Sequence, residues 1–210
     1  MTLPIEPADL VLFLTASLTL NLTPGNDMMF VAGQSLRGNV RLGVAASLGI
    51  ATGSLIHLAL IALGAGVVLE QHPLVFDVIR YLGAAYLVWL AVQTLRAGTR
   101  TIYLPVEQRS SFAAWRDGTL VNVFNPKTII FMFAFLPPFV RPENGSVLLQ
   151  LLILGMIFNI GGTLINCTVA ILTSHSATLY SSNVKIAKSF AILSAALFLV
   201  LAARMVFDWH

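Results

Sequence analysis

The chain has 210 residues, of which 57% are hydrophobic and 10% are charged, with a formal net charge of +3. Soluble domains carry about 25% charged residues, so this composition excludes a water-soluble globular protein and indicates a protein embedded in a membrane. The basic residues lie in loops between apolar segments, so the small positive charge gives no support to nucleic-acid binding. The length accommodates about six spans of about 20 residues, and we expect one domain over residues 1–210.

Six apolar segments follow one another along the chain. Two are interrupted: residues 8–36 at Pro24-Gly25, and residues 119–140 at Asn125-Pro126. The continuous segments cover residues 42–69, 78–95, 147–172 and 186–207. No segment alternates with a period of two, so we predict an all-α, polytopic membrane protein with six transmembrane helices rather than a β-barrel. No Lys or Arg precedes Arg37, so we expect the first segment to be a retained span and not a cleaved signal peptide.

The basic residues between the segments predict how the chain is oriented in the bilayer. The loops after the first, third and fifth segments, with their flanks, hold Arg37, Arg41, Arg96, Arg100, Arg109, Arg116, Lys185 and Lys188. The opposite side holds only Arg80, Arg141 and Arg204. Because the more basic loops remain in the cytoplasm, we expect both termini outside an inner membrane and loop 96–117 in the cytoplasm.

Each interrupted segment opens one half of the chain. The first half covers residues 8–95 and the second residues 118–207, with the polar stretch 96–117 between them. An odd number of spans per half inserts the second half in the opposite direction. We therefore predict two inverted three-helix repeats with proline-broken first and fourth helices, an arrangement that supports alternating access in secondary transporters.

The first interruption places polar groups at membrane depth. Pro24 removes a backbone donor and Gly25 lets the chain bend, so backbone groups are freed and need partners. Thr23, Asn26 and Asp27 are suited to supply them, and the helix N-terminus that follows favours an anionic group such as a substrate carboxylate. A charged carboxylate in an apolar segment costs about 2.5–3.5 kcal/mol, which favours a functional role for Asp27. The alternative is a structural kink in which Asp27 only caps the next helix.

The second interruption repeats this pattern with the opposite charge. Pro126 opens the backbone, Asn122 and Asn125 can satisfy it, and Lys127 follows with apolar sequence on both sides. One interpretation is that Lys127 points outward to the membrane surface. The interpretation we favour turns it inward, paired with Asp27 or with a substrate carboxylate. In an inverted repeat the two breaks meet near the middle of the membrane, so we expect Asp27 and Lys127 to lie close together.

Weaker signals lie in the second and fifth segments. His57 follows Ser54 by three residues and either handles protons or is a neutral, buried histidine bonded to Ser54 or to a carbonyl. Asn159, Thr163 and Asn166 form a polar stripe at helical spacing, which either lines a pathway or binds helices together. The residues expected along the substrate and proton pathway are Asp27, Lys127, Asn26, Thr23, Asn122, Asn125, His57, Asn159 and Asn166.

Other chemistries find little support in the sequence. Within the apolar segments Asp27 and His57 are too few to form a metal shell, so we expect no metal site. No nucleophile, zinc-protease or phosphate-loop pattern is present, and we do not expect an enzyme. The single cysteine, Cys167, excludes an internal disulfide.

Both interruptions and their surroundings resemble the LysE/RhtB family of bacterial amino-acid exporters, and the resemblance covers the whole chain. The residues that carry it are Thr23-Pro24-Gly25-Asn26-Asp27, Ser35-Leu36-Arg37-Gly38, Gly43, Gly49, Gly53, His57, Asn122, Asn125-Pro126-Lys127 and Phe133-Ala134-Phe135-Leu136-Pro137-Pro138-Phe139-Val140. Asn26 stands where the family's Pro-Gly-Pro signature has its second proline. This departure predicts either a less open first break or a side-chain contact from Asn26.

The resemblance implies a secondary transporter that exports amino acids or related small zwitterionic metabolites by proton antiport, with the proton gradient as energy source and no cofactor. Asp27 and Lys127 would then engage the amine, the carboxylate or the coupling proton at a central site. Two alternatives stay open, an ion or metal carrier of similar architecture and a non-transporting membrane scaffold. Six short spans enclose little volume, so a homodimer in the lipid bilayer is a reasonable expectation.

Overall fold

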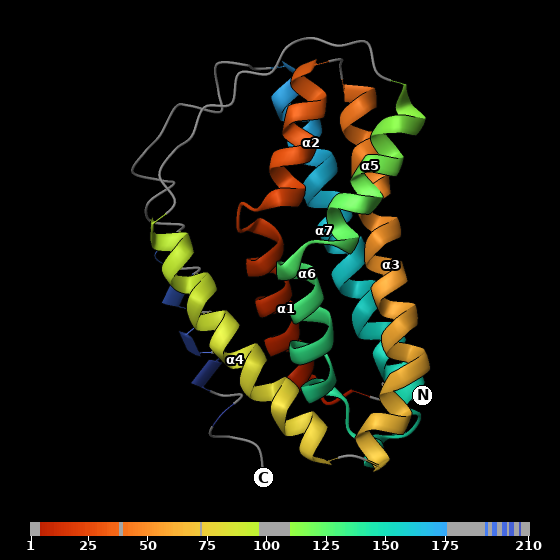
Figure 1. Cartoon of the computed structure of the whole chain (residues 1–210), viewed down its shortest axis with the longest axis vertical. Helices are drawn as coiled ribbons and strands as arrows, with labels where there is room; N and C mark the ends of the chain where they lie inside the picture. The colour runs from red at the N-terminus through yellow and green to blue at the C-terminus, as the bar shows by residue number, and fades with distance from the viewer. Residues whose placement is uncertain are drawn as a thin grey trace.

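The computed structural model describes residues 5–37, 40–71, 73–96 and 110–175, together with scattered positions between 192 and 206. These residues form a bundle of helices without a strand, which confirms the all-α prediction for this part of the chain. Figure 1 shows two broken helices that run in opposite directions, with both breaks near the middle of the long axis. Of the predicted segment 186–207 the structure describes only these scattered positions, so most of that prediction lies outside the described residues.

The first broken helix consists of α1 (Pro7–Leu22) and α2 (Asn26–Arg37). α1 ends where the backbone of Thr23 becomes extended, with φ −69° and ψ 119°. A residue before a proline prefers this conformation, so Pro24 determines where α1 ends. α2 carries Asp27 in its first turn, where the helix dipole favours a negative charge.

The second broken helix contains four consecutive elements. They are α5 (Ser111–Val123), α6 (Pro126–Ile130), the π-helical turn η1 (Phe131–Phe135) and the 3-10 turn η2 (Pro137–Phe139). The helix axes before and after the break at residues 124–125 differ by 54°. The predicted interruption at Asn125-Pro126 is therefore a real change of direction.

The chemistry of this second break is local. The Asn125 side chain accepts a hydrogen bond from the backbone N–H of Lys127 at 3.0 Å and caps α6. Pro126 occupies the first turn of α6, where its missing N–H leaves no hydrogen bond unmade. An asparagine followed by a proline thus ends one helix and starts the next.

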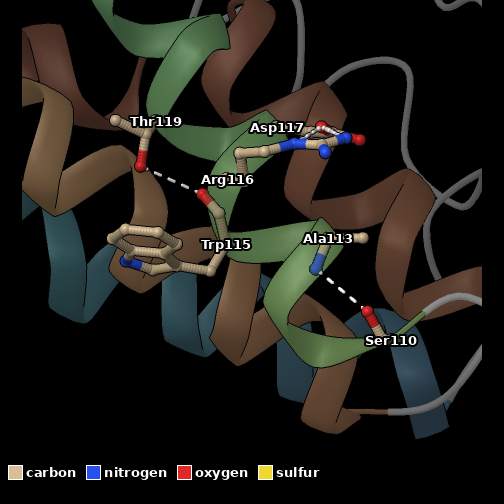
Figure 2. Close-up of polar contacts among 6 residues, drawn as sticks. All are labelled: Ser110, Ala113, Trp115, Arg116, Asp117 and Thr119. Carbon is tan, nitrogen blue, oxygen red and sulfur yellow. Dashed lines mark hydrogen bonds and ion pairs between the residues drawn. The ribbon is translucent and has the colours of Figure 1, made fainter.

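α5 begins inside residues 96–117, the stretch that hydropathy predicts as a loop, so the predicted loop is too long. The Ser110 hydroxyl accepts a hydrogen bond from the backbone N–H of Ala113 at 3.1 Å and starts the helix (Figure 2). Arg116 and Asp117 form an ion pair at 2.9 Å on the helix surface. Charged residues lower the hydropathy of this turn without breaking the helix, which is the reason for the error.

The three remaining described helices are α3 (Val40–Gln71), α4 (Pro73–Arg96) and α7 (Val147–His175), and the 3-10 turn η3 (Pro142–Asn144) precedes α7. α3 packs against α2, α5 and α7, while α4 packs against η1 and α3. Figure 1 shows α4 inclined at one edge of the bundle. The central position of α3 places both broken helices against a common neighbour.

Glycines set the distance between α3 and α5. A Cβ atom at Gly49 would collide with the carbonyl oxygen of Trp115, and one at Gly118 would lie 2.5 Å from the carbonyl oxygen of Ala46. The obstacles are backbone atoms, which cannot rotate away as a side chain can. The two backbones therefore touch only because these positions lack side chains.

We expect Gly49→Ala to destabilise the protein by about 2 kcal/mol, because the added methyl group forces α3 and α5 apart. Thermal unfolding of the purified protein in detergent measures this effect. Gly64→Ala is the matched control in the same helix, since a Cβ there meets no atom within 4 Å. Equal unfolding temperatures for the two variants would contradict the close contact.

Several described helices have the length and hydropathy of membrane spans. Val40–Gly64 and Val147–Ser174 are long and apolar enough to cross a bilayer singly, and the bent pair Ser111–Val123 and Pro126–Phe139 qualifies when it is counted as one span. α1 is apolar but shorter than a full span. The described residues thus contain two or three candidate spans.

Candidate functional site

A small cavity of about 30 Å³ lies where the two helix breaks face α3 and α7. Its lining residues are Asn21, Asp27, Met28, Ile50, Ser54, Asn122, Lys127, Thr128, Phe158, Asn159, Gly162, Thr163 and Asn166. Most of these side chains are amides, hydroxyls or charged groups, although the surrounding bundle is strongly apolar. A polar cavity within such a bundle marks the place where a polar solute can be held.

Lys127 connects the two breaks directly. Its Nζ donates hydrogen bonds to the carbonyl oxygens of Leu20 and Thr23, each at 2.8 Å. These carbonyls lie in the last turn and the cap of α1, and the Leu20 carbonyl also accepts a hydrogen bond from the backbone N–H of Thr23 at 3.2 Å. A positive charge is also favoured at the C-terminal end of a helix dipole. Lys127 therefore stabilises the end of α1 from the other broken helix.

Asp27 is the negative group of the cavity. Its Oδ2 accepts hydrogen bonds from the Asn122 side-chain amide at 2.9 Å and from the Thr128 hydroxyl at 3.4 Å. Its Oδ1 is buried and has no hydrogen-bond partner among the described residues. One oxygen of the carboxylate is thus held in place, and the other is free to bind a donor.

Asn122 joins three helices at this point. Its side-chain amide donates to Asp27 on α2 and to Thr128 on α6. The backbone carbonyl oxygen of Asn122 lies 3.4 Å from Nε2 of His57 on α3. Because a carbonyl can only accept, this contact is a hydrogen bond in the forms of His57 that carry a proton on Nε2. Nδ1 of His57 is buried without a partner among the described residues.

Asp27 and Lys127 line the same cavity, but no ion pair within 4.0 Å joins them in the described structure. Each charge is instead held by the opposite broken helix, Asp27 through Asn122 and Lys127 through the end of α1. Gly25 leaves room for the Lys127 ammonium at the end of α1, since a Cβ at Gly25 would lie only 3.3 Å from Nζ of Lys127. The two charges are neighbours in one site without forming a direct ion pair.

The structure brings most of the predicted residues to this place. Asn159 and Asn166 line the cavity from α7, and Asn159 also donates to the Ala51 carbonyl at 3.4 Å. Thr23 contributes its carbonyl, while its hydroxyl donates back to Thr19. Thr23, Asn125 and His57 are buried beside the cavity without lining it, whereas Asn26 is exposed and does not line it either. The structure therefore gives no support to a contact from Asn26 within the site.

Sequence reasoning missed two polar residues of the cavity. Asn21 lies in the last turn of α1 and donates to the carbonyl of Phe158 on α7 at 3.1 Å. Thr128 follows Lys127 and contacts both Asp27 and Asn122. Their positions within one turn of the two prolines are the only sequence signal that points to them.

Comparison with known proteins gives consistent matches. The family model described as LysE type translocator matches residues 18–208. A homoserine/homoserine lactone efflux protein of Salmonella typhimurium strain LT2 is 34% identical over 145 residues, which cover 69% of this chain and 70% of the relative. An uncharacterized membrane protein of Vibrio cholerae is 32% identical, covering 63% of this chain and 65% of the relative.

A leucine efflux protein of Salmonella choleraesuis is more distant, at 28% identity over 63% of this chain and 65% of the relative. No solved structure matches the chain. The LysE type translocator model spans most of the sequence and agrees with the resemblance at the two breaks. The protein is therefore a membrane protein and a transporter rather than an enzyme, and it belongs to the LysE type translocator family.

Proposed function

We propose that this protein exports amino acids or related small zwitterionic metabolites across the bacterial inner membrane in exchange for protons. Its family and the efflux relatives support export of a small molecule. The observation that carries the proposal is the cavity between the helix breaks, which holds a carboxylate and an ammonium that are not paired with each other. A zwitterion presents the two complementary charges.

The hydrogen-bonding groups that line the cavity suggest how a zwitterion would bind. The unpartnered Oδ1 of Asp27 is placed to accept hydrogen bonds from the substrate amine. The substrate carboxylate would accept a hydrogen bond from Nζ of Lys127 in place of one of the two α1 carbonyls. A volume of about 30 Å³ is far below that of an amino-acid site. Binding therefore requires the broken helices to move apart, which the interrupted helical hydrogen bonding at Pro24 and Pro126 favours.

Competition for one carboxylate would couple the substrate to protons. A protonated Asp27 cannot pair with an amine, so proton and substrate exclude each other at this position. If the carboxylate carries the substrate outward and a proton inward, the two fluxes are exchanged. Asn122 contacts both Asp27 and His57, so His57 lies close to the carboxylate. The unpartnered Nδ1 of His57 is suited to accept a proton on this route.

The exchange requires a site that opens to one side of the membrane at a time. Two inverted three-helix repeats would provide this motion, and the opposite directions of α1–α2 and α5–α6 support such a repeat (Figure 1). With both termini outside and loop 96–117 in the cytoplasm, the end of the bundle where α1 begins is the exit side.

The test is transport by the purified protein in proteoliposomes loaded with a panel of radiolabelled amino acids. We expect at least one neutral amino acid to leave the vesicles, and about tenfold faster when the outside is made acidic. Vesicles without protein provide the background. If no amino acid moves, the transport proposal is wrong; if the flux ignores the pH gradient, the proton coupling is wrong.

A further inference from the structure

A column of phenylalanine rings leads away from the cavity toward the end of the bundle where α1 begins. Phe158 lines the cavity and stacks on Phe131, with ring centroids 4.4 Å apart. Phe131 stacks on Phe135 at 4.8 Å, and Phe135 contacts Phe139 at 4.9 Å. Phe13 of α1 contacts all of the last three, at centroid distances of 5.3–6.3 Å. We call Phe13, Phe131, Phe135 and Phe139 the aromatic gate.

The aromatic gate is buried and lies between the two broken helices. All four residues are at most 7% exposed, so their rings pack against one another and against the surrounding helices. Phe13 comes from α1, while the other three come from η1 and η2, which follow the second break. Any motion that separates the broken helices therefore separates Phe13 from its three partners.

An ion pair closes the same end beyond the rings. Arg141, two residues after Phe139, donates from Nε to Oδ2 of Asp9 on α1 at 2.8 Å. The backbone of Arg141 is held by Gln150 of α7 through hydrogen bonds at 2.9 Å and 2.8 Å. Hydrogen bonding to Asp9 raises the pKa of Arg141, so this arginine stays charged. We call the Asp9–Arg141 pair the latch.

The segment that carries the gate contains an irregular turn. The N–H of Leu136 donates to the carbonyl of Phe131 at 3.1 Å, a bond that spans five residues instead of four. The following Pro137 has no N–H with which to continue a regular helix. A π-helical turn holds one residue more than an α-helical turn, so a change between the two rotates the residues beyond it around the helix axis. Such a rotation would move Phe135 and Phe139 relative to Phe13.

The opposite end of the bundle is closed in a different way. A Cβ at Gly43 of α3 would collide with the Ser35 hydroxyl of α2 and lie 2.7 Å from Cβ of Ala170 on α7. Helix backbones meet there with only small side chains between them. Opening that end requires whole helices to separate, whereas rings and the ion pairs of Arg141 with Asp9 at 2.8 Å and Glu6 at 3.7 Å close the end near Arg141.

We propose that the aromatic gate and the latch form the exit gate of the transport path. This inference rests on the proposed transport function, because a gate needs a path to close. When the latch breaks, α1 is released from the segment after η2, and the rings turn aside to connect the cavity with the exit side. The gate then closes again behind the departing substrate.

The test measures access to the cavity directly. Thr163 lines the cavity from α7, so Thr163→Cys in a Cys167→Ser background provides a single reporter thiol. Arg141→Gln is added to remove the latch, and a membrane-impermeant thiol reagent is applied to either face of sealed vesicles. We expect labelling from the Arg141 face to become about fivefold faster, because loss of the latch shifts the population toward the open state. Labelling from the other face should stay unchanged.

Arg116→Gln is the control, because Arg116 also forms an ion pair at 2.9 Å (Figure 2), but on α5, which begins at the opposite end of the bundle (Figure 1). Phe135→Leu is the second gate variant, since it removes a ring and keeps an apolar side chain. If labelling from the Arg141 face stays unchanged or undetectable in both gate variants, the exit gate is wrong. An equal increase in Arg116→Gln would also overturn it, because general loosening would then explain the result.

The labelling rate does not depend on which solute is carried. If labelling is faster in the gate variants but no amino acid is transported, the gate is supported and the proposed substrate class is wrong. Transport of an amino acid with unchanged labelling would remove the gate and leave the proposed function standing. The two proposals therefore fail separately.

Discussion

Replacing Lys127 with methionine is expected to reduce transport about a hundredfold and to destabilise the protein by about 3 kcal/mol. The ammonium donates to two carbonyls at the end of α1, both at 2.8 Å. Methionine keeps most of the volume of the side chain but removes both hydrogen bonds, and the Leu20 carbonyl then retains only the backbone N–H of Thr23. The loss therefore affects the shape of the first break as well as the charge of the cavity.

Two measurements separate these roles. Thermal unfolding of the purified Lys127→Met variant in detergent reports the lost hydrogen bonds, and Lys127→Arg should recover much of that stability because it restores donors. Substrate preference reports the charge. Wild-type protein should favour an amino acid over its carboxamide, and Lys127→Met should bind both equally weakly. If the variant keeps the preference, Lys127 serves only to cap α1 and does not touch the substrate.

The local chemistry of the two breaks was predictable from the sequence. Pro24 and Pro126 each end a helix because a proline restricts the residue before it and donates no hydrogen bond, and these effects act over one or two residues. Asn125 caps α6 for a similarly local reason. The positions of both breaks therefore follow from neighbouring residues, without knowledge of the tertiary structure.

The partners of the charged residues were not predictable in the same way. Lys127 binds carbonyls 107 and 104 positions away, and backbone carbonyls carry no sequence signal at all. The sequence favoured an ion pair of Lys127 with Asp27 or a substrate carboxylate, whereas the structure gives Asp27 to Asn122 on the other broken helix. Which of several polar groups meet depends on how the helices pack. Periodicity alone does not determine that arrangement.

Hydropathy failed where a helix extends beyond its apolar part. The first turns of α5 contain the ion pair of Arg116 with Asp117. The low hydropathy of these residues predicts a loop, although Ser110 caps a regular helix there. The π-helical turn at Phe131–Phe135 was likewise invisible, since its residues have the composition of an ordinary apolar helix. Sequence patterns thus predicted the breaks better than the helix ends or irregular turns.

Asp27→Asn is expected to reduce the rate of proton-coupled transport about a hundredfold, while the protein stays as stable as wild type. The amide oxygen of the new side chain can still accept from Asn122 in place of Oδ2. The amide nitrogen then replaces Oδ1, which has no partner among the described residues. Since removing a buried charge also removes its desolvation cost, the fold loses little.

This separation of transport from stability distinguishes Asp27 from Lys127. Amino-acid efflux driven by an imposed pH gradient measures the first quantity, and thermal unfolding in detergent the second. Asp117→Asn is a suitable control, because it makes the same change on the surface of α5 and should preserve both quantities. Asp27→Glu keeps the charge but lengthens the side chain in a cavity of about 30 Å³, so we expect partial activity.

A contrary outcome would change the role assigned to Asp27. If Asp27→Asn transports at the wild-type rate, the carboxylate neither binds the substrate amine nor carries the proton. If transport is lost together with stability, Asp27 acts mainly through its bonds to Asn122 and Thr128. Only loss of transport in a stable protein supports a carboxylate held at one oxygen so that the other can alternate between proton and substrate.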